Sequence, residues 1–520
     1  MFESLKGKDP KVGFIAFFSS ILCWQIVYNI GIGFTYDSAR YLFFASQFED
    51  FGNTFTAPYA PLLPFLLGSL QSIGCSADGA IFVVFSTCLT VITVGLLHIC
   101  RTLKVPYEFF VVCALSMVCS EHMLMLLTRV LTELGFATLL TLAIVGALRT
   151  WNQQRISKIL VLACMLLPLQ RFIGVVSSNV ILFLTVLLME GTVVAKLQSY
   201  VRRALVINIP FGIFAVTNWI ACGSFLGVRK ANETDTYLSN TQLMFDVLTS
   251  DFGYEMIILL AVVVLVIVQV WKGVSKKDYQ SSLTLENKVL FLSVCMLMVH
   301  LVAQIHASTS VIINPINPRY IIPFTPVFAI QFIVLAKWCQ THLESKFKSP
   351  LVFCAAGILL LYPLYTGYQF VGAMDPGFNS RRLGHKYDIN LNRIVEYLAE
   401  SDDAKDIVFY EQGRAHLAFS YLEMGHFDIL SPGCRGARTL LRYGAHYTPN
   451  LIAVPDCPDG VTSNVRYSIP KTIQVTPKTT HVLLSKWSLS KDAREEASLD
   501  LLSKQFEIVK QNKLFILFER

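Results

Sequence analysis

The chain has 520 residues, of which 54% are hydrophobic and 15% are charged, and its formal net charge is +7. A soluble globular domain carries about 25% charged residues, so this composition excludes an ordinary soluble protein and indicates a polytopic membrane protein. The positive charge requires no nucleic-acid partner, because cytoplasmic lysines and arginines of a membrane protein account for it.

Apolar segments long enough to cross a hydrocarbon core of roughly 30 Å recur from residue 12 to about residue 371. The proline-containing stretch 60–74 is too short to cross, and we predict it to be re-entrant or interfacial. We predict about eleven transmembrane helices, near residues 12–34, 79–100, 106–127, 130–148, 159–190 (two short spans folded at Gln170 and Arg171), 204–222, 254–271, 289–307, 320–337 and 350–371. The sequence thus divides into a transmembrane domain, residues 1–371, and a soluble domain, residues 372–520.

Lysine and arginine set the predicted orientation. With the N-terminus in the cytoplasm, eighteen of them lie on the cytoplasmic side and six on the opposite side before residue 372. This bias supports a cytoplasmic N-terminus. An odd number of spans then places the soluble domain outside the cytoplasm.

The two large outer loops differ in character. The first, about 35–60, has apolar residues at 41, 44, 45 and 48, which indicate an amphipathic segment in the membrane interface. The second, 223–253, is polar and contains the glycosylation pattern Asn232-Glu233-Thr234, which has meaning only in a secretory pathway.

The soluble domain alternates short β-rich runs with helical patterns. We predict strands at 406–410, 451–454 and 481–484 and a terminal hairpin within 506–518, with helices near 390–400, 412–424 and 491–505. This order indicates a small α/β domain.

Five short motifs follow one another in a defined order: Asp37-Ser38-Ala39-Arg40-Tyr41, Pro58-Tyr59-Ala60-Pro61-Leu62, Glu133 after Leu131-Thr132, Arg171-Phe172-Ile173-Gly174, and Pro318-Arg319-Tyr320-Ile321-Ile322-Pro323. Their order and predicted topology resemble the integral-membrane GT-C glycosyltransferases, the clan of aminoarabinose lipid A transferases and protein O-mannosyltransferases. The resemblance covers roughly residues 10–340. It implies a GT-C-like membrane domain that transfers a sugar from a polyprenyl phosphate to a glycan, lipid or protein acceptor on the outer side.

The chemistry of such a transfer assigns expected roles. A base must take the acceptor's proton, and cations must stabilise the charge that develops on the phosphate. We expect Asp37 to be the base, Arg40 to be its structural partner, and a single displacement to invert the anomeric centre. Tyr41 follows in the same segment as a cavity candidate.

Two arginines are the expected phosphate ligands. Arg319 follows Pro318 at the outer mouth of a span, where a guanidinium can bind two phosphate oxygens, and Tyr320 lies beside it. The alternative for both residues is a membrane-edge anchor. Arg171 lies between two apolar stretches on the outer side, either as a second substrate contact or as a side chain that snorkels into the headgroups.

The remaining candidates have two open interpretations each. Glu133 and Arg129 are four residues apart, so they either neutralise one another or Glu133 functions as the clan's pattern implies.

The pairs Glu49-Asp50 and Glu121-His122 are weak candidates for contacts to a divalent cation, and solvated loop charge is the alternative. His306 is a candidate for lining the cavity, whereas His300 is expected to be a satisfied interior group. No cofactor is demanded.

Two other classes of function remain in competition. A transporter of a lipid or glycan would show inverted repeats and midplane charges, whereas the outer charges here cluster near span ends. A non-catalytic scaffold with a degenerate GT-C fold would tolerate the loss of Asp37. The compact loops favour a bacterial inner membrane over the endoplasmic reticulum.

Overall fold

The structure is a computed structural model, and it describes most of the membrane domain and parts of the C-terminal region. The described residues are 10–30, 41, 45, 60–222, 225, 235–275, 284–310, 316–342, 361–371, 406–410, 428–430, 481–485, 502–511 and 515–520.

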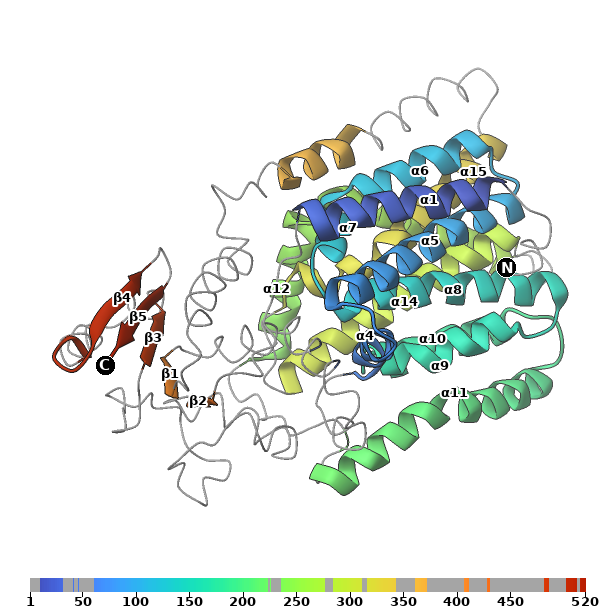
Figure 1. The fold of residues 1–520 in the computed structure, drawn as a ribbon. Coiled ribbons are helices and arrows are strands. Elements are labelled where there is room, and N and C mark those ends of the chain that lie inside the picture. Colours follow the sequence, from blue (N-terminus) through green and yellow to red (C-terminus); the bar gives the residue numbers. More distant parts are fainter. Residues whose placement is uncertain are drawn as a thin grey trace.

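Helices make up nearly all of the membrane domain (Figure 1). In chain order they are α1 Pro10–Trp24, the π-helical segment Gln25–Ile30, α4 Leu62–Ser72, α5 Ala77–Thr102, α6 Tyr107–Cys119, α7 Glu121–Leu127, α8 Thr132–Gln153, α9 Lys158–Gln170, α10 Gly174–Leu187, α11 Val193–Cys222, α12 Tyr237–Ser250, α13 Gly253–Ser275, α14 Leu285–Ser310, the 3₁₀ turns η3 Pro318–Tyr320 and η4 Ile322–Phe324, and α15 Thr325–His342. Residues 361–371 form a further helix.

Side-chain caps fix several of the helix starts. The hydroxyl of Ser76 accepts a hydrogen bond from the backbone N–H of Gly79 before α5. Ser120 does the same for Met123, and this cap separates α7 from α6 at a bend of 61°. Hydroxyl acceptors at this position satisfy backbone donors that a helix leaves unpaired.

Six of the described helices are long and apolar enough to cross a membrane, or up to eight if each of two bent pairs counts as one span. The helices α4, α9 and α10 are shorter. The predicted total of eleven spans is therefore not confirmed, although α9 ends at Gln170 and α10 begins at Gly174, where the sequence predicted a fold between two short spans.

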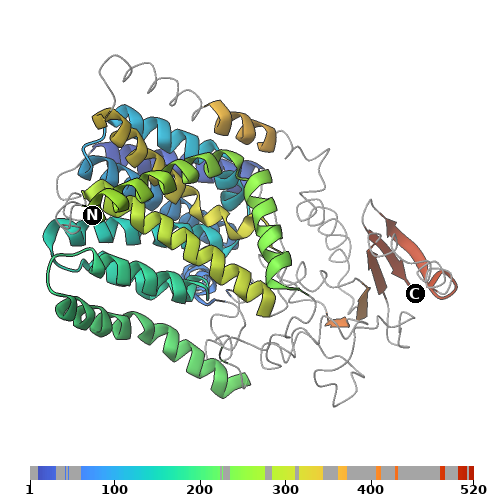
Figure 2. The ribbon, with the colours of Figure 1, turned by 180° about the vertical axis from the view of Figure 1, so that it is seen from behind.

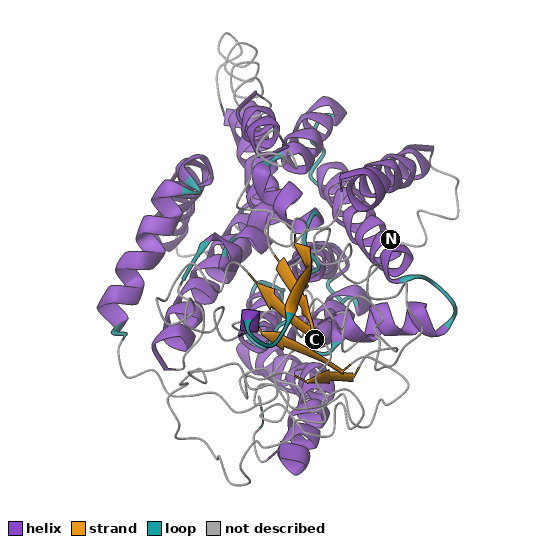
Figure 3. Cartoon of the chain, turned by 60° about the vertical axis from the view of Figure 1, so that its left-hand side comes forward, coloured by secondary structure: helices purple, strands orange, loops and turns teal. Residues whose placement is uncertain are grey.

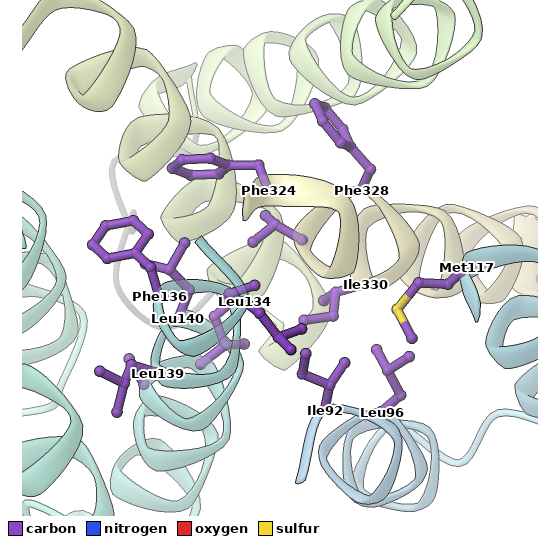
Figure 4. Packing of buried hydrophobic residues seen from close by; sticks show 14 of the residues in the cluster. Ile92, Leu96, Met117, Leu134, Phe136, Leu139, Leu140, Phe324, Phe328 and Ile330 are labelled. Atoms are coloured by element: carbon purple, nitrogen blue, oxygen red, sulfur yellow. The ribbon is translucent and has the colours of Figure 1, made fainter. Parts of the chain in front are cut away.

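The central helix of the bundle is α8. Of its span, 83% is buried, against 22% for α11, which has an exposed apolar face at the edge of the bundle (Figures 1 and 2). Around α8, side chains from α5, α6, η4 and α15 interdigitate (Figure 4). The labelled members are Ile92, Leu96, Met117, Leu134, Phe136, Leu139, Leu140, Phe324, Phe328 and Ile330.

A glycine allows α9 to approach α8 closely. A Cβ atom added at Gly146 would lie 2.6 Å from the Cα atom of Leu160, which is closer than real Cβ contacts. Small residues at helix interfaces let backbones meet in this way inside membranes. This contact holds the short α9, and with it the break after Gln170, against the central helix.

The segment 235–250 differs from the sequence prediction. It was expected to be part of a polar outer loop, but residues 237–250 form α12, which begins with a capping box between Thr236 and Ser239. The axis of α12 makes an angle of 107° with the following helix, so α12 runs across the end of the bundle (Figures 1 and 2).

The described C-terminal strands form one mixed sheet in the order β2-β1-β3-β5-β4, drawn in orange in Figure 3. Strand β1 pairs parallel with β2 and β3, whereas β5 pairs antiparallel with β3 and β4. The bounds are β1 Asp406–Tyr410, β2 Asp428–Leu430, β3 His481–Ser485, β4 Glu507–Gln511 and β5 Phe515–Glu519.

Several of these strands lie where the sequence predicted them. The runs 406–410 and 481–484 are strands, and the terminal residues form a hairpin. The expected strand 451–454 and the helices 390–400 and 412–424 lie outside the described residues. The α/β class of this region and the domain boundary at residue 371 therefore stay predictions.

Candidate functional site

The first turn of α8 carries a fully buried carboxylate, that of Glu133. Arg319 donates a hydrogen bond from Nε to its Oε1 atom. The Nη1 atom of Arg171 lies 3.7 Å from the same oxygen. The hydroxyl of Thr132 donates to Oε2 at 3.4 Å. Because the N-terminus of a helix also favours negative charge, Glu133 is stabilised as a carboxylate between two cations.

Arg171 owes its position to the residue before it. The Nε2 atom of Gln170 donates a hydrogen bond of 2.8 Å to the carbonyl oxygen of Thr132, and Gln170 is 2% exposed. The amide fits because residue 135 is glycine: an added Cβ there would lie 2.7 Å from Cδ of Gln170. The C-terminus of α9 is thereby fixed to the first turn of α8, and Arg171 faces Glu133.

Arg319 is held by a 3₁₀ turn. The side chain of Asn317 caps this turn by accepting a hydrogen bond of 3.1 Å from the backbone N–H of Arg319, and Pro318 occupies its first position. The carbonyl oxygen of Tyr320 lies 3.2 Å from Nε2 of the buried His300 on α14. A rigid turn of this kind limits the directions that the Arg319 side chain can take.

Two aromatic rings flank the guanidinium of Arg171. Its Cζ atom is 5.8 Å from the centroid of Phe136 and 5.8 Å from that of Tyr320. Both distances fall within the range of cation–π attraction. Tyr320 therefore links the two arginines, because it follows Arg319 in the chain and contacts Arg171 through space.

The cluster formed by Glu133, Arg171 and Arg319 carries a net charge of +1, from two guanidiniums and one carboxylate. The side chains of Arg171 and Arg319 are 13% and 23% exposed, whereas that of Glu133 is enclosed. Within the described part of the chain, Nη1 of Arg171 has no hydrogen-bond acceptor despite its burial. An unsatisfied donor of this kind is costly, and an anionic group would satisfy it. The cluster is suited to bind an anion.

The location of the cluster follows from helix direction. The N-terminal end of α8, the C-terminal end of α9 and the turn before α15 meet here. The cluster therefore lies at one end of the bundle. By the predicted orientation this is the outer end. The cations that pair with Glu133 are Arg171 and Arg319, not the Arg129 of the predicted pairing.

Other predicted site residues form separate contacts. The Nδ1 atom of His122 lies 3.2 Å from Oε1 of Glu255, and its ring stacks on that of Phe252 at 4.2 Å. His306 contacts the hydroxyl of Tyr237 at 2.7 Å. These pairs connect α7 to α13 and α12 to α14, and neither Glu255 nor Tyr237 was predicted as a partner.

The structure places the remaining candidates as follows. Tyr41 is helical and buried, and Arg129 and Glu121 are half-buried. Asp37, Arg40, Glu49 and Asp50 lie outside the described residues. Among the described residues, no group of three or more His, Cys, Asp or Glu side chains is arranged to hold a metal ion.

His300 and Gln170 add to what the sequence indicated. His300 was expected to be a satisfied interior group, and it is buried, but its Nδ1 atom has no hydrogen-bond partner among the described residues. Gln170 was not a candidate. Its signal was an amide placed directly before Arg171 in an otherwise apolar stretch.

Comparison with solved structures identifies the fold. The chain superposes on ArnT from Cupriavidus metallidurans in the apo state with a TM-score of 0.55 and 12% sequence identity, over 99% of this chain and 98% of that one. For the same enzyme bound to undecaprenyl phosphate, the values are 0.52, 13%, 97% and 97%. The chain has the GT-C fold.

No family model and no curated protein sequence matches the chain. At this level of identity the GT-C fold is what the comparison shows. The motif order of the sequence and the superposition agree on it, and the GT-C fold extends over nearly the whole chain.

Proposed function

We propose that this protein transfers a sugar from a polyprenyl-phosphate donor to an acceptor on the outer side of the membrane. The observation that carries the proposal is the cluster of Glu133, Arg171 and Arg319 at one end of a GT-C fold. The similar ArnT structure is bound to undecaprenyl phosphate, which supports a lipid phosphate as the anion for this cluster.

The two arginines bind the donor phosphate in this proposal. The guanidinium of Arg319 is fixed by its turn and by Glu133, and Arg171 offers a buried donor. As the bond between the anomeric carbon and the phosphate oxygen breaks, the electron pair remains on the phosphate. Cations already in position stabilise that charge without reorganising.

Asp37 completes the proposed reaction. Its carboxylate accepts the proton of the acceptor hydroxyl while the oxygen attacks the anomeric carbon from the face opposite the phosphate. One displacement of this kind inverts the configuration. The products are the glycosylated acceptor, a polyprenyl phosphate and the proton held by Asp37.

The partners follow from this chemistry. The donor is a polyprenyl-phosphate sugar, and the acceptor is a glycan, lipid or protein hydroxyl on the outer side. The proposed orientation has a cytoplasmic N-terminus and an extracytoplasmic C-terminal region, in a bacterial inner membrane. The C-terminal region would recognise the acceptor or cap the site.

Transfer of labelled sugar from a panel of polyprenyl-phosphate sugars tests the proposal. We expect the purified protein to consume one donor of the panel. Asp37→Asn should still bind that donor and lose transfer by about a hundredfold or more, whereas Asp246→Asn, on the exposed face of α12, should behave as the wild type. Normal transfer by Asp37→Asn would contradict the assignment of the base.

A further inference from the structure

The cluster of Glu133, Arg171 and Arg319 carries less positive charge than a site made of the two arginines alone. Two arginines alone would present a charge of +2. Glu133 reduces it to +1, and its fully enclosed carboxylate lies behind the partly exposed guanidiniums. A ligand that reaches the arginines therefore does not displace Glu133, so the carboxylate remains as a fixed counter-charge while the ligand is bound.

The substrate and product of the proposed reaction differ by one charge at the phosphate. A polyprenyl-phosphate sugar is a phosphodiester with a single negative charge. The polyprenyl phosphate that leaves is a monoester, which carries close to two negative charges at pH 8 because its second pKa is about 6. A site that binds the product much more tightly than the substrate would be inhibited by its own product.

We infer that Glu133 is the specificity-determining counter-charge of this site: it matches the arginine pair to a singly charged lipid phosphodiester and limits affinity for the doubly charged monoester. This inference rests on the proposed function. Glu133 acts through the arginines and touches no reacting atom, so it is a positioning residue.

One carboxylate is sufficient for this role because it lies close to both arginines. Oε1 accepts the hydrogen bond from Arg319 and faces Nη1 of Arg171 at 3.7 Å, so a single oxygen acts on both cations. The hydroxyl of Thr132 donates to Oε2, and the N-terminus of α8 favours negative charge at this position. In a partly buried site, charges a few ångströms apart interact more strongly than they do in water. Adding or removing one charge in the cluster should therefore change its affinity for a charged ligand strongly.

A matched pair of lipids with the same chain differs chiefly in the charge of the phosphate. The probes are undecaprenyl phosphate, a monoester, and undecaprenyl methyl phosphate, a diester with the same lipid chain. Binding of both is measured at pH 8 to full-length protein in nanodiscs of zwitterionic lipid. The readout is the selectivity, defined as the Kd of the monoester divided by the Kd of the diester.

Three variants test the net charge of the cluster: two change it and the third restores it. Glu133→Gln raises it to +2 and should lower the selectivity, in favour of the monoester, by about tenfold or more. Arg171→Gln lowers it to zero and should raise the selectivity by a similar factor. The double variant Glu133→Gln/Arg171→Gln returns to +1, and its selectivity should lie near the wild-type value although both affinities fall.

A purely structural role for Glu133 would weaken the two probes by the same factor and leave the selectivity unchanged, and that result would overturn the inference. If Glu133→Gln does not fold, Arg171→Gln and the double variant decide by the same criterion. If the wild type binds neither lipid, the proposed function itself fails. If it binds both and the selectivity does not follow the charge, the proposed function stands and the inference falls.

Discussion

Glu133 shows at the scale of single residues how the fold handles a charge inside a membrane domain. Its carboxylate is enclosed, and the two partners that compensate it come from the break after α9 and from the turn before α15. Burying an ion is costly unless it is paired, and removing one partner leaves an uncompensated charge. The three residues are thus coupled in stability and, under the proposed function, also in binding.

Loss of Arg319 should therefore destabilise the protein through Glu133. We expect Arg319→Gln to lower the free energy of unfolding by about 3 kcal/mol, the lower end of the range for a broken buried pair, because Arg171 still faces the carboxylate. The double variant Glu133→Gln/Arg319→Gln should recover most of this loss without recovering lipid binding. Thermal unfolding in detergent measures both.

Arg202→Gln, on the exposed surface of α11, is the matched control and should change stability little. Equal stability of Arg319→Gln and the control would show that the pair with Glu133 contributes nothing to folding.

The members of this cluster were predictable from the sequence, but their contact was not. Arg319 and Arg171 stood out because they belong to the motifs that resemble the GT-C enzymes and lie at the outer ends of apolar segments, where a guanidinium can bind a phosphate. Glu133 had only Arg129 within helical reach, whereas its actual partner Arg319 is 186 positions away. Periodicity reports neighbours on one helix and carries no information about such pairs.

At the scale of secondary-structure elements, close packing of the short helix α9 against α8 positions Arg171. The break between α9 and α10 positions Arg171 only because α9 lies tightly against α8, at Gly146 near one end and at Gly135 near the other. The break itself was predicted from the polar residues Gln170 and Arg171 in an apolar run. The glycine contacts were not predicted, because a glycine in a helix gives no sign of what it faces.

Gly146→Ala tests this packing. The added methyl group meets the backbone of Leu160, which cannot rotate away as a side chain can, so we expect a loss of about 1–3 kcal/mol in the free energy of unfolding. The control is Gly212→Ala on α11, where an added Cβ meets nothing within 4 Å. That variant should be neutral or slightly stabilising, since alanine favours the helix. Equal effects of the two substitutions would contradict the packing.

The helix α12, at the same scale, was not predicted from the sequence. Residues 237–250 contain many Ser, Thr, Asn and Asp side chains, which are typical of loops. The helix starts at a capping box in which Ser239 occupies position N3, three residues after the N-cap Thr236, in place of the usual glutamate or glutamine. The apolar face that packs on the bundle, with Met244, Val247 and Leu248 buried, is only one side of this short segment.

At the scale of the whole molecule, hydropathy and charge bias predicted the membrane domain and its orientation. Composition predicted a membrane protein, and apolar runs long enough to cross the bilayer predicted that its spans are helical. The predicted total of eleven spans is not confirmed, since α9 and α10, two of the predicted spans, are shorter than a helix that crosses a membrane by length. The sheet order of the C-terminal strands depends on long-range pairing and was not predictable from local patterns.

Reporter fusions test the orientation. A fusion after Gln154, between α8 and α9, should be cytoplasmic, whereas fusions after Asp251 and Arg520 should lie outside, because the lysines and arginines concentrate on the side of Gln154. A reporter active only in the cytoplasm and one active only outside give complementary signals at each position. The reverse pattern would place the Glu133 cluster on the wrong side for the proposed reaction.

The most direct test of the central claim is a cryo-electron microscopy structure of the protein with undecaprenyl phosphate. We expect phosphate oxygens within about 3 Å of guanidinium nitrogens of Arg319 and Arg171, with Glu133 still bound to Arg319 behind them. A phosphate bound elsewhere in the membrane domain, with the arginines still paired with Glu133, would contradict the proposed phosphate site and leave the cluster as a structural ion pair.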